Sequence, residues 1–307
     1  MKNLVIGIDV GGTNIKLGIV TPQGKIVARS GLCTNNYRNK GKLVKALLGS
    51  IHELQTKNRL KRKDFSGVGI GLPGLIDSQK GIVTFLPNIP GWHNVPLSQI
   101  LKKELKLPVF LENDVNQITL AEWKFGAGVG QKNMICMTLG TGIGGGLIIE
   151  NQLYRGSHFV AGELGHMPLN EKGPSCSCGG VACYERYIGN QTLLKKIRSV
   201  FKKNLKIQEV RKLAEKGNKK ALKFWKDTAA HLGNGLIGPI NLLNPSLVII
   251  GGGVSNNHRF LFKTIRKIIK ERCMKVQGSV VRIVRAELGD DAGIMGAQVL
   301  VKEMLEK

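Results

Sequence analysis

Three cysteines fall within eight positions of this chain, in the stretch CSCGGVACYER. They are Cys176, Cys178 and Cys183, and His166 precedes the first of them by ten residues in GELGHM. Three thiolates and one imidazole make a tetrahedral Zn²⁺ ligand set. A two-cysteine redox pair would leave the third thiol and the histidine unexplained. The pattern therefore favours zinc, and redox use and plain burial stay open as alternatives.

The rest of the chain indicates a cytoplasmic protein, where clustered cysteines more often bind metal or do redox work than form structural disulfides. A charge at Asp9 interrupts the N-terminal apolar run, which argues against a signal peptide. No stretch approaches the roughly 18 apolar residues that a membrane helix needs, so no membrane partner is expected. The 307 residues, 40 of them glycine, are typical of a turn-rich globular protein of about two domains.

The formal net charge of +25 is unevenly distributed. Thirteen Lys or Arg residues stand against two Glu between Lys195 and Lys226, and KNRLKRK, residues 57–63, adds a second basic run. Such runs attract polyanions, including nucleic acid, polyphosphate and ATP. Neither run carries interleaved aromatic residues or a nucleic-acid module, so solvated helix faces are favoured and nucleic acid is an unlikely partner.

Three glycine-rich turns each follow an apolar strand, in DVGGTNIK, in MTLGTGIGGGLII and in PSLVIIGGGVS. Backbone N–H groups in such turns can converge on phosphate oxygens, because no Cβ blocks close approach. In the first turn Thr13 can donate to a phosphate, Lys16 can supply charge and Asp9 can hold Mg²⁺ through water. The third turn could face the base and ribose. The residues predicted to contact the nucleotide are Asp9, Gly11, Gly12, Thr13, Lys16, Gly140, Thr141, Gly142, Gly252 and Gly253.

The elements around these turns predict a duplicated α/β architecture. The first two turns each join two strands, about 130 residues apart, whereas a dinucleotide-binding fold requires a helix after its glycine turn. A GxxxxGK[ST] P-loop is also missing. Strands and helices alternate in the second half of the chain, so we expect two α/β lobes around a cleft, with each half contributing one turn.

A candidate catalytic carboxylate lies in LPVFLENDVNQITLAEWKFG. This stretch predicts a strand that ends at Glu112 or Asn113 and a helix that starts near Asp114. Asp114 could be a helix N-cap. It could equally accept a proton from an alcohol that attacks a phosphate, with Asn113 beside it to fix a hydroxyl, and both roles are compatible.

Taken together, these motifs resemble the ROK family of sugar kinases and sugar-sensing repressors, and they are most similar to its bacterial glucokinases. The resemblance covers nearly the whole chain, through DVGGTNIK, GLPGLID, PNIPGW, LENDVN, LGTGIGGGLI, GELGHM, CSCGGVACYE, GGGVS and GDDAG in that order. It implies the duplicated, two-lobed actin/hexokinase-like (ribonuclease H-like) fold. The expected lobes are residues 1–117, with a C-terminal helix at about 291–307 packing back on them, and residues 118–290, which carry the zinc loop.

The resemblance also implies an ATP-dependent hexose 6-kinase, with glucose as substrate, Mg²⁺ beside ATP and Asp114 as general base. The alternatives are a kinase of N-acetylmannosamine, fructose or allose, or a polyphosphate-using glucokinase. A sugar-sensing repressor is disfavoured, since such repressors add an N-terminal helix-turn-helix domain and the phosphate turn here begins at Asp9. We also expect a homodimer or homotetramer. The residues implied to hold sugar hydroxyls are Asn88, Asn113, Asp114, Glu163, His166 and Glu185, and those implied to hold a structural Zn²⁺ are His166, Cys176, Cys178 and Cys183.

The zinc loop suggests why a phosphoryl transferase would carry this metal. An imidazole bound to Zn²⁺ through one nitrogen is held neutral, and its other nitrogen carries a proton. His166 could thus be both a ligand and a donor to the sugar, and we hypothesise that zinc sets sugar recognition. One departure from the family pattern CxCGxxGCxE is Ala182, which stands where a glycine is expected. If that position needs a positive φ, alanine costs about 1 kcal/mol.

Overall fold

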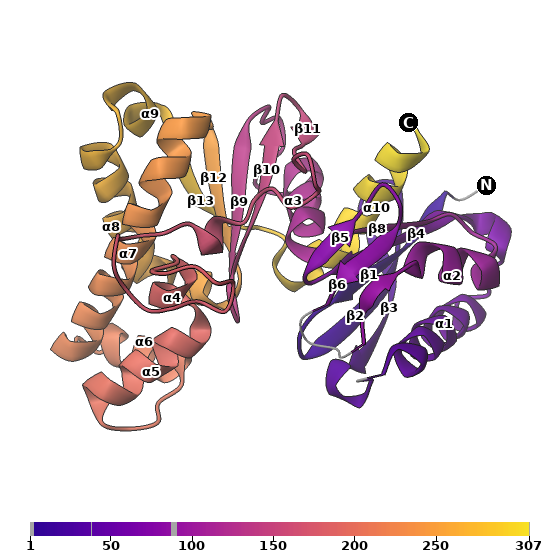
Figure 1. The fold of residues 1–307 in the computed structure, drawn as a ribbon, viewed down its shortest axis with the longest axis horizontal. Coiled ribbons are helices and arrows are strands. Elements are labelled where there is room, and N and C mark those ends of the chain that lie inside the picture. Colours follow the sequence, from indigo (N-terminus) through magenta and orange to yellow (C-terminus); the bar gives the residue numbers. More distant parts are fainter. Residues whose placement is uncertain (1–2, 38, 87–90, 307) are drawn as a thin grey trace. The chain divides into compact units, whose positions relative to one another are not determined.

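The computed structural model describes residues 3–37, 39–86 and 91–306. The chain divides into two compact units (Figure 1). The first comprises Met1–Gly130, Leu153–Ala161 and Leu288–Lys307, and the second comprises Gln131–Gln152 and Gly162–Glu287. Among the described residues, no helix is both long and apolar enough to cross a membrane.

The first unit is built on a five-stranded sheet in the order β3-β2-β1-β4-β8. Its strands are β1 (Leu4–Val10), β2 (Asn14–Val20), β3 (Ile26–Cys33), β4 (Phe65–Leu72) and β8 (Val109–Asn113), with a three-stranded sheet of β5 (Leu75–Asp77), β6 (Ile82–Phe85) and β7 (His93–Val95). The helices are α1 (Lys40–Lys57), α2 (Leu97–Leu105), α3 (Asp114–Phe125) and α10 (Ala292–Leu305), with short 3₁₀ turns η1 (Thr34–Asn36), η2 (Arg62–Asp64) and η5 (Gly289–Asp291).

The two faces of β1 pack against different helices. Ile6 and Ile8 join the large hydrophobic core that includes side chains of α1 and α2. Val5 and Gly7, on the opposite face because strand side chains alternate, meet α10. A Cβ at Gly7 would overlap the main chain of Ile294, so glycine there lets α10 lie directly on the sheet.

The second unit repeats the sheet in the order β11-β10-β9-β12-β13. Its core includes Trp225, Leu236, Ile250 and Ile265, from α7, β12 and α8. The strands are β9 (Met134–Leu139), β10 (Ile143–Ile149), β11 (Gln152–Leu153), β12 (Leu247–Gly251) and β13 (Arg282–Arg285). The helices are α4 (Glu185–Ile188), α5 (Asn190–Phe201), α6 (Ile207–Glu215), α7 (Lys219–Leu243), α8 (His258–Arg272) and α9 (Lys275–Val280), with 3₁₀ turns η3 (Leu164–His166) and η4 (Gly253–Asn257).

The strand pairing confirms the duplicated α/β fold predicted from the sequence. In each sheet the first strand pairs antiparallel with the next strand of its hairpin, β1 with β2 and β9 with β10. The same strand pairs parallel on its other side, β1 with β4 and β9 with β12, and a fifth parallel strand follows, β8 or β13. Two glycine-turn hairpins therefore occupy equivalent places in two sheets.

The first unit ends later than the boundary expected after residue 117, which would cut helix α3. Helix α3 packs along α10, so it stays with the first unit up to Gly130. The buried Glu122 carboxylate of α3 accepts hydrogen bonds from the N–H groups of Ala127, at 3.0 Å, and Leu288, at 2.9 Å. These N–H groups lie close in sequence to where the chain leaves the first unit and where it returns.

Candidate functional site

The junction of β8 and α3 presents Asp114 as predicted. The strand ends at Asn113 and the helix begins at Asp114, whose half-buried carboxylate accepts the N–H of Val115 at 2.9 Å. The N-cap is Asn113, however, and not Asp114. The side-chain oxygen of Asn113 accepts the N–H groups of Val115, at 2.9 Å, and Asn116, at 3.2 Å. Asp114 thus stands at the positive end of the helix dipole, which favours a carboxylate.

The first glycine turn carries the charged groups that the sequence indicates. Asp9 and Lys16 are partners across the β1–β2 hairpin. Burial raises the pKa of Asp9, while nearby Lys16 opposes the shift and Asp290 adds to it. Lys16 Nζ donates to the main-chain oxygen of Asp290 at 3.1 Å and lies 3.6 Å from its carboxylate. The turn therefore holds two carboxylates and one ammonium group within the first unit.

The tip of this turn is short and exposed. The Gly11 N–H donates to the Asn14 carbonyl at 2.9 Å, and the Thr34 hydroxyl donates to the Gly11 carbonyl at 2.8 Å. Gly12 and Thr13, between these anchors, are exposed. This geometry leaves a tight backbone loop that an anionic ligand can approach.

The second and third glycine turns lie next to each other in the second unit. Gly251 at the end of β12 pairs with Thr138 near the end of β9. The turn that follows β9 is closed by the Gly140 N–H, which donates to the Gly142 carbonyl at 3.0 Å. Gly252, which has a φ of 82°, lies so close to Leu139 that a Cβ would overlap its main chain. Two of the three predicted phosphate turns thus share one edge of a sheet, at the carboxyl ends of its parallel strands.

Glu185 ties the second glycine turn to the start of α4. Its Oε2 accepts the N–H of Ile143 at 2.8 Å, and a Cβ at Gly142 would overlap that oxygen. The main chain of the same region is joined to the turn, since Asn190 N–H donates to the Gly140 carbonyl at 3.2 Å. Gly142 is therefore required for the close approach of a carboxylate.

Glu163 and His166 are near neighbours, on and beside η3. His166 Nε2 lies 3.9 Å from Glu163 Oε2. Burial raises the pKa of Glu163, against the lowering effect of His166 and with a further raising effect of Glu185. Three residues that the family resemblance implies as sugar contacts are therefore within electrostatic reach of one another in the second unit.

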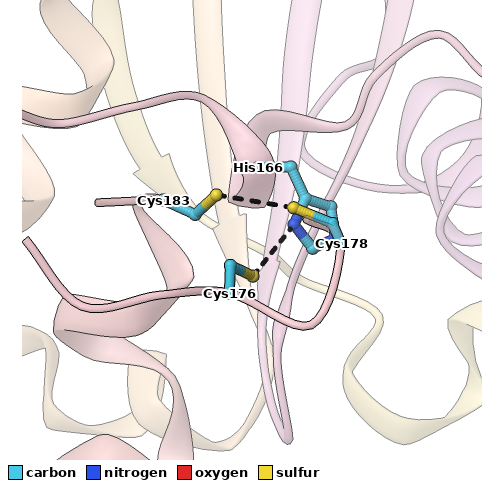
Figure 2. Close-up of side chains that lie close together, drawn as sticks. All are labelled: His166, Cys176, Cys178 and Cys183. Carbon is cyan, nitrogen blue, oxygen red and sulfur yellow. Dashed lines mark hydrogen bonds between the residues drawn. The ribbon is translucent and has the colours of Figure 1, made fainter. Parts of the chain in front are cut away.

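The cysteine cluster is assembled as predicted (Figure 2). One ligand atom each from His166, Cys176, Cys178 and Cys183 lies within 4.8 Å of all the others. Cys178 Sγ is 3.6 Å from Cys183 Sγ, and Cys176 Sγ is 3.7 Å from His166 Nδ1. A tetrahedral Zn²⁺ with bonds of about 2.3 Å to sulfur and about 2.1 Å to nitrogen needs ligand separations of about 3.6–3.8 Å. The donor set and its spacing fit zinc.

The thiols differ in how readily they ionise. Burial raises the pKa of Cys183 to about 12, whereas the backbone N–H of Gly180 lowers the pKa of Cys178. Because metal ligands must be deprotonated, a cation bound there would supply the charge that keeps Cys183 as a thiolate. His166 Nδ1 lies 3.7 Å from Cys176 Sγ (Figure 2). Nε2 lies 3.9 Å from Glu163 Oε2, so the two ring nitrogens have different neighbours.

Ala182, which stands where the family pattern has glycine, adopts a left-handed backbone conformation. Its φ is 55°, and the residue is fully buried. Its N–H donates to the Pro174 carbonyl and its carbonyl accepts the N–H of Leu169, so this conformation is held on both sides. Alanine in the left-handed region costs about 1 kcal/mol relative to glycine. The cysteine loop tolerates this cost without losing its ligand geometry.

The predicted residues are distributed between the units. The first holds Asp9, Gly11, Gly12, Thr13, Lys16, Asn113 and Asp114, and the second holds Gly140, Thr141, Gly142, Glu163, His166, Cys176, Cys178, Cys183, Glu185, Gly252 and Gly253. Asn88 lies outside the described residues. Sequence reasoning assigned no role to Asp290, the partner of Lys16, or to Glu112, which forms a buried ion pair with Arg155. A glutamate inside an apolar strand was the available signal for Glu112.

Comparisons with known proteins find similarity over nearly the whole chain. The model of the ROK family matches residues 5–304. The chain is 34% identical to a glucokinase of Thermotoga maritima, over 99% of each chain. It is also 33% identical to the xylose repressor of Bacillus subtilis, over 96% of this chain but 76% of the repressor.

A solved structure of similar sequence has the same fold. The ROK family glucokinase of Streptomyces griseus, in complex with glucose and AMPPNP, superimposes with a TM-score of 0.82 at 31% identity. The match covers 98% of this chain and 100% of that protein.

Proposed function

The chain belongs to the ROK family, and from this premise we propose that it is an ATP-dependent kinase that phosphorylates the 6-hydroxyl of glucose. The observation that carries the proposal is similarity over essentially the full length to glucokinases, one of them solved with glucose and an ATP analogue. Asp114, the first residue of α3, and the glycine turns of the two hairpins support the proposal, because the reaction needs a general base and phosphate-binding groups.

In the proposed reaction Asp114 is the general base. The 6-hydroxyl of glucose attacks the γ-phosphorus of ATP in line, its proton passes to the Asp114 carboxylate, and ADP leaves. Asn113 has its side-chain oxygen committed to capping α3. Its amide nitrogen donates one long hydrogen bond to the Gly74 carbonyl, at 3.5 Å, and its second N–H is proposed to contact a sugar hydroxyl. Glu163, His166 and Glu185 are proposed to hold the other hydroxyls, as is Asn88.

The phosphate chain of ATP is proposed to lie against the glycine turns. Gly11, Gly12 and Thr13 would contact it from the first hairpin, while Lys16 supplies positive charge and Asp9 holds Mg²⁺ through water. Gly140, Thr141 and Gly142 would contact it from the second hairpin, with Gly252 and Gly253 toward the base and ribose. Positioning and electrostatic stabilisation are the main sources of catalysis in phosphoryl transfer.

We propose that His166, Cys176, Cys178 and Cys183 hold a structural Zn²⁺. His166 would bind this ion through Nδ1, the nitrogen near Cys176, which would keep the imidazole neutral with its proton on Nε2. Nε2 is the nitrogen that faces Glu163, so it is suited to donate to a sugar hydroxyl. Glu163 and Glu185 lie close in sequence to ligands of the same ion. Donors and acceptors that match a sugar hydroxyl disfavour sugars that lack that hydroxyl.

A coupled assay over a panel of hexoses, each with ATP or polyphosphate as donor, tests the proposed function. We expect the highest kcat/KM for glucose with ATP. A higher value for N-acetylmannosamine, fructose or allose would change the substrate, and a higher value with polyphosphate would change the donor. No turnover on any hexose together with sugar-dependent DNA binding would favour a repressor, the function of relatives that the chain matches over 76–78% of their length.

A further inference from the structure

A buried ion pair lies directly beside the strand end that carries Asp114. Glu112 is 2% exposed, and its Oε2 accepts a hydrogen bond from Arg155 Nε at 2.6 Å; Arg155 itself is 12% exposed. Removing two charges from water is expensive, and replacing such a pair by apolar residues often costs no stability. A contribution to stability is therefore a weak explanation for this pair.

The second oxygen of Glu112 holds the main chain around Asp114. Glu112 Oε1 accepts the backbone N–H of Asn113 and the side-chain amide of Asn116, each at 3.0 Å. β8 is the last strand in the order of its sheet, so Glu112 supplies an acceptor where a further strand would otherwise do so. The carboxylate thus fixes the residue before Asp114 and a residue in the first turn of α3.

Arg155 binds the other carboxylate oxygen, Oε2, and so holds the Glu112 side chain in place. Its guanidinium contacts Glu112 through Nε, while Nη2 is buried without a hydrogen-bond partner among the described residues. The Arg155 carbonyl accepts the N–H of Ala161 at 3.0 Å, two residues before Glu163. Buried donors are rarely left unsatisfied. The unpaired Nη2 therefore makes this ion pair more costly, which favours a functional explanation over a structural one.

We infer that Glu112 is a positioning residue for Asp114 and that Arg155 fixes the rotamer of Glu112. The inference rests on the proposed kinase function, since the step that depends on the orientation of Asp114 is phosphoryl transfer. Misplacing a reacting group by about 1 Å can cost about 100-fold in rate. Loss of the Glu112 acceptor therefore lowers kcat and leaves the KM for ATP nearly unchanged.

Two matched double variants test the inference. Glu112→Gln/Arg155→Met and Glu112→Leu/Arg155→Met both remove the two charges and approximately keep the side-chain volumes. Only the glutamine variant keeps an oxygen that can accept the Asn113 N–H. We expect kcat to fall about 100-fold in the leucine variant but less than about fivefold in the glutamine variant, with the KM for ATP within about twofold of the parent in both. The exposed His158, in the same segment as Arg155, provides the control His158→Ala, which should retain parental kcat.

Equal kcat values in the two double variants would overturn the inference. Hydrogen exchange of the Asn113 amide provides a second measurement that needs no substrate. We expect protection in the parent and in the glutamine variant; rapid exchange in the folded parent would also overturn the inference. If the leucine variant does not fold, this protection and the kcat of the glutamine variant decide. A parent that phosphorylates no hexose would instead refute the proposed function, and the amide exchange would still test the Glu112 contact.

Discussion

The hairpins β1–β2 and β9–β10 occupy equivalent positions in two sheets of the same strand order, yet they carry different chemistry. The first has its own charged residues, Asp9 and Lys16, facing each other across the hairpin. The second has none at the turn and receives a carboxylate from Glu185, more than 40 residues later in the chain. The repeated backbone therefore supplies the same glycine-turn hairpin twice, while the charged groups at the two turns come from different places in the chain.

The fifth strands show the same contrast. β8 is followed by Asp114 at the start of α3. The equivalent strand β13 ends at Arg285 and leads to α10, which belongs to the first unit. Within the described ranges, the duplicated scaffold thus carries a candidate general base in the first unit and a candidate metal centre in the second. Substitutions in the two units should therefore have different effects, and four experiments test this contrast.

The largest effect is expected from Asp114→Asn, which removes the base without changing its size. Turnover should fall about 10³-fold, because a positioned general base contributes about 10²–10⁴ to the rate. Glucose affinity, measured by calorimetry, should stay within about tenfold of the parent. Near-parental turnover in a coupled assay would remove Asp114 from its role and would end the contrast between β8 and β13.

A smaller loss, confined to sugar affinity, is expected from Cys183→Ser in the second unit. Loss of one zinc ligand should release the metal and weaken glucose binding about 10–100-fold, with nucleotide affinity within about twofold. Zinc content by mass spectrometry and binding by calorimetry measure the two effects. Cys273→Ser, at a buried cysteine outside the cluster, is the matched control and should retain zinc. Unchanged glucose affinity in zinc-free protein would refute the link between zinc and sugar recognition.

Gly142→Ala tests the contact between the second hairpin and the Glu185 carboxylate. The new Cβ would overlap Glu185 Oε2, so the free energy of unfolding should fall by about 1–3 kcal/mol. Gly140→Ala, two residues earlier, meets no atom within 4 Å and should change stability by less than about 0.5 kcal/mol. Urea unfolding of the two variants provides the comparison. Equal stabilities would show that Glu185 moves away without cost.

The smallest effect is expected from Asp9→Asn in the first hairpin. Burial raises the pKa of Asp9 above its value in the unfolded chain, so its ionised form lowers stability at pH values above the folded pKa. The asparagine variant should therefore have the higher Tm at pH 7. The difference should shrink as the pH falls and disappear near about pH 3, where the carboxyl is protonated in both states. A Tm difference that grows toward low pH would contradict this sign.

Local patterns explain which features could be predicted. The alternation of apolar strands and glycine turns predicts both hairpins, and the change from LPVFLEN to an amphipathic stretch predicts the start of α3 at Asp114. The spacing of three cysteines and a histidine predicts a metal centre because ligands this close in sequence can meet within one loop. The comparison with the family pattern singled out Ala182, and the structure shows that its φ is positive.

The sequence by itself determined the paired glycine-turn hairpins of the duplicated α/β scaffold and the cluster of three cysteines and one histidine, because each depends on residues near one another in the chain. Only the tertiary structure decided the partners that come from afar. Glu185 meets the turn at Gly142, Asp290 pairs with Lys16, and Arg155 pairs with Glu112. These contacts join residues that are far apart in the chain. Local sequence periodicity cannot predict them, because they depend on how the intervening loops bring the two partners together.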